Sequence, residues 1–236
     1  MNVLTFKGMT TGILDGDCVF TPDDSGEMNV NLVISTAYNV IPIWIRIACD
    51  NFKQAKLASE NIQLEWNEDV DTQKALLIAE LAPSMQVIVS CGIALDALYD
   101  TLRPHAGLSV EEIKKWKDNG TGRAKQISEV IRRVYKLNNN VFKEFRDLIT
   151  QIIKFRDRAV HPSLELKNAC NRDDLPIAVD WKFSAFRFSN ASACLISTVN
   201  ILVYLHNSKC TNNSVNTQLD NLVLALQELG VPLELG

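Results

Sequence analysis

Residues 141–160 read VFKEFRDLITQIIKFRDRAV, and this stretch decides which fold class the chain adopts. Its apolar side chains recur at alternating steps of four and three residues, at Val141, Phe145, Leu148, Ile152, Phe155 and Ala159. That spacing is typical of a helix that packs between other helices. We therefore interpret the stripe as structural and predict a helix over 141–160 at the heart of a bundle.

The flanking sequence extends the helical pattern in both directions. Ser109 and Glu112 form a Ser-x-x-Glu capping box that opens a short helix. Pro42 and Pro83 fall inside expected helices, where proline kinks or breaks the backbone. The expected helices cover 36–66, 71–102, 109–116, 123–137, 141–160, 189–206 and 216–229.

The N-terminal residues have a different pattern. Asp15-Gly16 stands between apolar ends and predicts a hairpin turn. Residues 29–34 alternate polar and apolar side chains, as a half-buried strand does. We expect a small antiparallel sheet, joined by a strand over 176–183. The predicted fold class is mainly α: a β-rich element at 1–34 and a helical bundle at 35–236, together one compact domain.

Composition favours an ordinary soluble protein. Of the 236 residues, 47% are hydrophobic and 22% are charged, with a net charge of −4. These values exclude a disordered tail, a collagen-like repeat and a strongly basic coat protein. The apolar stretches at 81–95 and 191–205 are shorter than the ~20 residues of a membrane span. We expect no membrane association.

The six cysteines contain no CxxC pair, so they do not predict a zinc or redox motif. Most of them stand in apolar runs, where cysteine behaves as a small buried hydrophobe. The first twelve residues show no signal-peptide pattern. Together these features predict a reducing, cytoplasmic location.

Charge is distributed unevenly. Between Thr101 and His161 there are 14 Lys and Arg against 7 Asp and Glu, although the whole chain is acidic. Such asymmetry is typical of a face that binds a polyanion, and equally of long solvated helices.

His161 is the histidine best placed for chemistry. It follows the cationic stretch Lys154–Val160, and Pro162 should end the helix there. Histidine serves as acid or base near neutral pH, and the planar fork of Arg156 suits a phosphate. Arg156 and His161 stand about 140° apart around a helix, so they do not share a face. The plain alternative is that these cations complement a helix C-terminus.

The segment Arg156-Asp157-Arg158-Ala159-Val160-His161 resembles the signature of the HEPN superfamily, which is Arg, a polar residue, a few variable residues and His near the end of a core helix. The stretch Val87–Leu102 resembles the earlier core helix of that family, and the helix from Ser189 also fits. The resemblance covers about 36–229, but only the six-residue motif is specific.

The resemblance implies a helical bundle that dimerises, with two motifs facing one cleft to form a metal-independent ribonuclease site. His161 would act as general base or acid, Arg156 would bind the phosphate, and Asp157 would orient one of them. From their charge, Arg158 and Lys154 would hold the RNA backbone. Members are often toxins or phage-defence effectors, so an antitoxin or regulatory partner is expected; no cofactor or metal is.

Two features depart from the family pattern. Some family toxins carry a modified Tyr two residues after the His, but position 163 is Ser, and the β-rich residues 1–34 are extra to the minimal bundle. The main alternative is a HEPN-like bundle that binds a protein or nucleotide without cleaving it. Asp96 and Asp100, four residues apart, form a carboxylate pair without further ligands, so an amphipathic face explains them better than a metal site.

Overall fold

A computed structural model describes residues 3–5, 9–161 and 165–233. The fold is mainly α, as predicted: 65% of the described residues are helical, and they include eight α-helices. The chain divides into two compact units, Met1–Val40 and Ile41–Gly236.

The N-terminal unit consists of two small antiparallel sheets. Strand β1 (Met9–Gly12) pairs with β4 (Ser35–Tyr38), and β2 (Cys18–Pro22) pairs with β3 (Met28–Leu32). The β2–β3 hairpin closes through the turn Asp23–Gly26, where the Gly26 amide donates to the Asp23 carbonyl at 3.0 Å. The antiparallel character of this element was predicted correctly.

Two details of this unit differ from expectation. Asp15-Gly16 does form a turn, with the Asp17 amide 3.0 Å from the Leu14 carbonyl, but it connects strands of different sheets and closes no hairpin. Strand β4 also covers residues that were expected to begin a helix. Thr36 is β-branched and suits a strand, and Pro42 is favoured in the first turn of the helix that follows.

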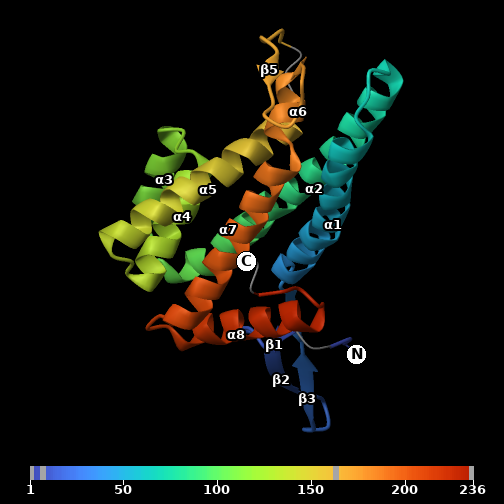
Figure 1. Ribbon diagram of the computed structural model, residues 1–236. Helices are drawn as coiled ribbons and strands as arrows, with labels where there is room; N and C mark the ends of the chain where they lie inside the picture. Colours follow the sequence, from blue (N-terminus) through green and yellow to red (C-terminus); the bar gives the residue numbers. More distant parts are fainter. Residues whose placement is uncertain (1–2, 6–8, 162–164, 234–236) are drawn as a thin grey trace. The chain divides into compact units, whose positions relative to one another are not determined.

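The helical unit contains the remaining elements (Figure 1). They are α1 (Ile41–Glu65), α2 (Val70–Leu102), the 3₁₀ turn η1 (Arg103–His105), α3 (Val110–Asp118), α4 (Arg123–Tyr135), α5 (Asn139–Val160), β5 (Cys170–Asn171), β6 (Ala178–Val179), α6 (Trp181–Ala185), α7 (Phe188–Ser208) and α8 (Asn213–Glu228). The long helices α1 and α2 form an antiparallel hairpin. Helix α2 is central, because α1, α4, α5 and α7 all pack against it.

Local signals account for most helix ends. Asp69 caps α2, because its carboxylate accepts from the Thr72 amide at 2.8 Å. The predicted capping box of Ser109 and Glu112 is present. Pro83 lies inside α2, which continues through it as one helix.

The apolar stripe of α5 packs as predicted. Phe145, Ile152 and Ala159 are buried, and the other stripe residues are partly buried. Buried Ile149 and Ile153 widen the stripe to the width of a helix in a globular core.

The core of the helical unit also contains three thiols, those of Cys49, Cys91 and Cys194. Burial raises the pKa of Cys194 to about 12, and it raises the pKa of Cys91 as well. These thiols therefore stay protonated in the folded bundle.

The strand expected over 176–183 does not join the N-terminal sheet. Only Ala178–Val179 is extended, and it pairs with Cys170–Asn171 as a two-residue ladder. Asp180 then caps the short helix α6, with its carboxylate 2.9 Å from the Lys182 amide. The Asx cap therefore ends the strand before it reaches Phe183.

Two helical segments, Val70–His105 and Phe188–Ser208, are long and apolar enough by length and composition alone to cross a membrane. Within their most apolar windows, 50% and 44% of the residues are buried inside the protein. The core helices of a soluble bundle pass the same test, so this property is weak support for a membrane span.

Candidate functional site

The motif predicted from sequence occupies the last turns of α5 and its C-cap. Lys154, Asp157, Arg158 and His161 are exposed, whereas the Arg156 side chain is only 16% exposed. Arg156 therefore lies against the bundle, and the other four candidate residues face solvent.

Arg156 is held by two carboxylates. Its Nη1 donates to Asp96 on α2, and its Nε donates to Asp157 on α5 at 2.9 Å. Its Nη2 also lies 2.9 Å from Asp157. Its aliphatic stem passes over Gly92, where an added Cβ would lie 2.8 Å from the Arg156 Cγ. The guanidinium is consequently fixed in one orientation.

Asp96 joins three helices at this point. Its second oxygen accepts from Nε of Arg123, the first residue of α4, at 2.6 Å. The Arg123 guanidinium also lies over the Tyr99 ring, 4.0 Å from the centroid. Asp100, one turn along α2, lies 3.9 Å from Arg123 and is 64% exposed. The Asp96 carboxylate thus serves two arginines, a role that sequence reasoning missed.

His161 ends α5. Its amide donates to the Asp157 carbonyl at 2.9 Å, and its φ of −122° and ψ of 65° leave helical geometry. Its imidazole makes no hydrogen bond with any residue that the structure describes. The side chain is therefore accessible, as a proton-transfer group must be. The expected ending before Pro162 occurs, although positions 162–164, and so Ser163, lie outside the described residues.

The structure does not bring Arg156 and His161 into contact. Arg156 turns toward α2, whereas His161 faces solvent, in keeping with their separation around the helix. Within one chain, then, the two groups present different surfaces.

A second polar cluster was not predicted. Arg172 and Glu80 are both buried, with side chains 1% and 2% exposed, and they pair at 2.7 Å. Arg172 also donates to Asp174 at 3.0 and 2.6 Å and to the Phe183 carbonyl at 2.9 Å. The hydrogen bonds from Arg172 hold the pKa of Asp174 below its usual value.

The other oxygen of Glu80 accepts from the Phe188 amide at the start of α7, at 2.9 Å. The cluster thus fastens the segment between α5 and α7 to the N-terminal half of α2. A sequence signal did exist, because Glu80 stands among apolar residues of a core helix, where a carboxylate needs partners. Its distant partner Arg172 could not be identified from spacing.

Among residues 3–5, 9–161 and 165–233, no three His, Cys, Asp or Glu side chains gather at a spacing that would hold a metal ion. No protein-family model, curated protein or solved structure matches the chain.

Proposed function

We propose that the protein is a metal-independent endoribonuclease of the HEPN type, acting through His161 and Arg156 at the end of α5. The observation that carries the proposal is the solvent-exposed imidazole of His161 at the same end of α5 as the exposed cations Lys154 and Arg158. A proton-transfer group and two phosphate-binding side chains thus occupy one helix end.

The proposed reaction is attack of a ribose 2′-oxygen on the adjacent phosphorus. The imidazole of His161 accepts the 2′-hydroxyl proton, the new O–P bond forms, and the bond to the 5′-oxygen breaks. The products are a cyclic phosphate and a free 5′-hydroxyl, which takes its proton from a protonated acid in the site. The family resemblance suggests that a second His161 supplies it, and therefore that the active form is a homodimer.

Arg156 would stabilise charge on the phosphate. Asp157 accepts a hydrogen bond from Nε of Arg156 and lies near Nη2, and Asp96 accepts one from Nη1. Because a guanidinium has five N–H donors, others stay available to a phosphate oxygen. In this arrangement Asp157 orients Arg156, which is one of its two expected roles.

The cationic surplus of residues 101–161 supports RNA as the partner, since phosphate neutralisation dominates nucleic-acid affinity. A cytoplasmic toxin or phage-defence effector, restrained by an antitoxin or regulatory protein, is the biological role that we propose. It rests on the resemblance of the motif.

A second candidate is a HEPN-like bundle that binds a partner without cleaving it. The observation that favours it is the pairing of Arg156 with both Asp96 and Asp157. In that function Arg156 is a structural tie between α2 and α5, and His161 only caps the helix.

RNA cleavage in the presence of EDTA tests the proposal. The protein is compared with His161→Ala, Arg156→Lys and the control His206→Ala, whose imidazole pairs with exposed Asp220 at 3.0 Å. General-base loss predicts a fall of about 10²–10⁴-fold for His161→Ala. Arg156→Lys keeps the charge but loses the fork, and should lower cleavage while the fold is retained.

His206→Ala should cleave like the unmodified protein. Cleavage that survives His161→Ala would contradict the proposal. If no RNA is cut by any variant, the non-catalytic function is favoured instead.

A further inference from the structure

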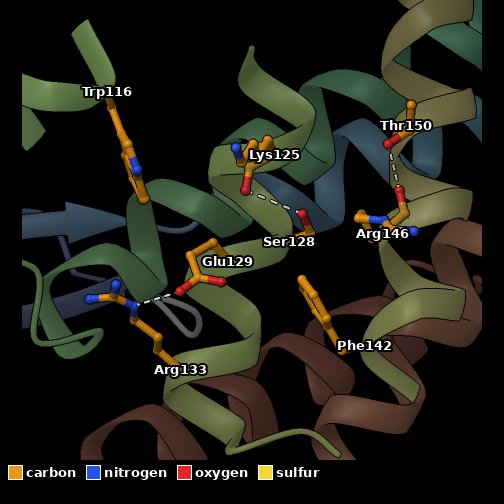
Figure 2. A pocket seen from close by; sticks show the side chains of 8 residues that line it. All are labelled: Trp116, Lys125, Ser128, Glu129, Arg133, Phe142, Arg146 and Thr150. Carbon is orange, nitrogen blue, oxygen red and sulfur yellow. Dashed lines mark hydrogen bonds and ion pairs between the residues drawn. The ribbon is translucent and has the colours of Figure 1, made fainter. Parts of the chain in front are cut away.

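A cavity of about 440 Å³ opens between α3, α4 and α5, and neither function above uses it (Figure 2). Its volume lies within the range of small-molecule sites in proteins, about 300–1,000 Å³. One face of helix α4 lines it from Lys125 to Arg133, and α5 lines it with residues four apart, beginning at Phe142. Trp116 comes from α3, so three helices contribute to one hollow.

Two aromatic side chains enter the cavity from different helices. Trp116 and Phe142 are both half-buried, and Figure 2 shows them on opposite sides of the view. Flat apolar faces on a cavity wall favour a flat ring in the ligand. The Arg146 guanidinium lies 6.0 Å from the Phe142 ring centroid, so positive charge stands beside this surface.

The charges that line the cavity are unequally satisfied. Arg133 is engaged, because it donates to Glu112 at 2.6 and 3.2 Å and to Glu129 at 2.8 Å. Glu129 also accepts two bonds from Arg132, at 2.8 and 2.6 Å, and these bonds hold its pKa below the usual value. Two arginines therefore neutralise the one carboxylate on the cavity wall, which weakens its repulsion of an anion.

Lys125 and Arg146 are the cations still available. The ammonium of Lys125 forms no ion pair with a residue that the structure describes. Among the described residues, the Arg146 guanidinium forms an ion pair only with its exposed neighbour Asp147, at 3.0 and 3.1 Å, and solvent screens such a pair. One cation from α4 and one from α5 thus border the cavity.

Two hydroxyls complete the polar lining. Ser128 is buried and donates to the Ala124 carbonyl at 2.9 Å, and Thr150 donates to the Arg146 carbonyl at 2.6 Å. Because each hydroxyl gives its proton to its own helix, its lone pairs can only accept. These hydroxyls suit N–H donors on a ligand, such as an aromatic amine.

We propose that this cavity binds a small aromatic anion: an amine-bearing planar ring between Trp116 and Phe142, with its anionic group on Lys125 and Arg146. Nucleotides and aminoaromatic carboxylates share this chemistry. The site does not rest on the ribonuclease proposal, because neither Arg156 nor His161 lines it.

Isothermal titration calorimetry with four probes tests the site: AMP, adenosine, inorganic phosphate and 4-aminobenzoate. Binding of AMP or 4-aminobenzoate in the micromolar to low-millimolar range is expected, and which one binds identifies the source of the ligand. Adenosine or phosphate alone should bind at least about tenfold more weakly, because each offers one half of the required chemistry. Phosphate binding as tightly as AMP would overturn the aromatic half of the proposal.

Variants locate the binding. Lys125→Gln, Arg146→Gln and Phe142→Leu should each raise Kd about five- to tenfold, the effect of one charge-assisted or aromatic contact. Lys143→Gln is the matched control, since Lys143 is an exposed cation on α5 that does not line the cavity. Urea midpoints verify that every variant folds.

His161→Ala should bind the ligand unchanged, even if it abolishes RNA cleavage. Failure of the ribonuclease proposal is thereby distinguished from failure of this one. The site would be overturned if neither AMP nor 4-aminobenzoate gave binding heat at about 5 mM. Equal Kd values in the cavity variants and the control would overturn it as well.

Discussion

Gly92 on α2 lies directly beneath the side chain of Arg156 on α5. A Cβ at position 92 would lie 2.9 Å from the Arg156 Cβ and 2.8 Å from its Cγ. The missing side chain lets the arginine stem cross α2 and reach Asp96, one turn further along the same helix. The orientation of Arg156 therefore depends on a glycine that lies on another helix, and no local sequence motif links the two positions.

Gly92→Ala tests this relationship. The added methyl must displace Arg156, and overpacking of this kind costs about 1–3 kcal/mol, partly offset by about 1 kcal/mol from the better helix propensity of Ala. We expect a lower free energy of unfolding in urea. Combined with Arg156→Ala, which removes Cγ and Cδ, the cost of Gly92→Ala should shrink. Strictly additive costs would show that the two residues are not coupled.

Asp96→Asn should destabilise the protein by about 1.5–3 kcal/mol, because it removes a charge that accepts from both Arg123 and Arg156. Asp100→Asn is the matched control on the same helix, since its carboxylate is 64% exposed and 3.9 Å from Arg123. It should change stability by less than about 0.5 kcal/mol. Equal effects in urea unfolding would argue against a special role for Asp96.

Arg172→Met should cost about 3–5 kcal/mol, because it leaves the buried carboxylate of Glu80 without its cation. The double variant Glu80→Met/Arg172→Met removes both charges and should recover much of that loss. Calorimetric melting of the two variants measures the difference. A double variant less stable than Arg172→Met would show that the hydrogen bond from the Phe188 amide to the Glu80 carboxylate matters more than the ion pair.

Acid should weaken the attachment of α3 to α4. Hydrogen bonds from Arg133, and next from the Ser109 amide, lower the pKa of Glu112 from 4.5 to about 2. A lowered folded-state pKa contributes stability above pH 4.5 that is lost as pH falls toward 2.

The measurement is urea unfolding of Glu112→Gln and of the unmodified protein between pH 6 and 2, over which their difference in stability should vanish. Glu60→Gln is the control, because Glu60 lies 4.0 Å from Lys56 in an exposed pair. It should follow the unmodified pH profile. A pH-independent gap for Glu112→Gln would contradict the assignment.

The fold class was predictable because its signals are local. The stripe of Val141–Val160 and the cap at Ser109 each depend on residues within a few turns, and both formed as expected. Strand pairing was less predictable, since β1 pairs with β4 across the intervening hairpin. Nothing near β1 in the sequence specifies that partner.

The candidate site was predictable only in part, for the same reason. The exposure of His161 follows from a helix that ends before Pro162. The partners of Arg156 come from another helix, and Asp96 is 60 residues away in the chain. The position of Asp96 on an amphipathic helix face could be recognised from the sequence, but the two arginines that it binds could not. The contact between Arg172 and Glu80 spans 92 residues and was equally invisible.

The rate at which the buried thiols are alkylated should report how often the helical bundle opens. Alkylating reagents attack the thiolate. While the bundle is closed, Cys91 stays a protonated thiol because its pKa is raised, and its burial keeps the reagent away. Cys18 is exposed and should be modified at once. Mass spectrometry of one sample over time would therefore record surface labelling within the first minutes and core labelling only as fast as the helices separate. The lag between the two is a direct readout of how often the bundle opens.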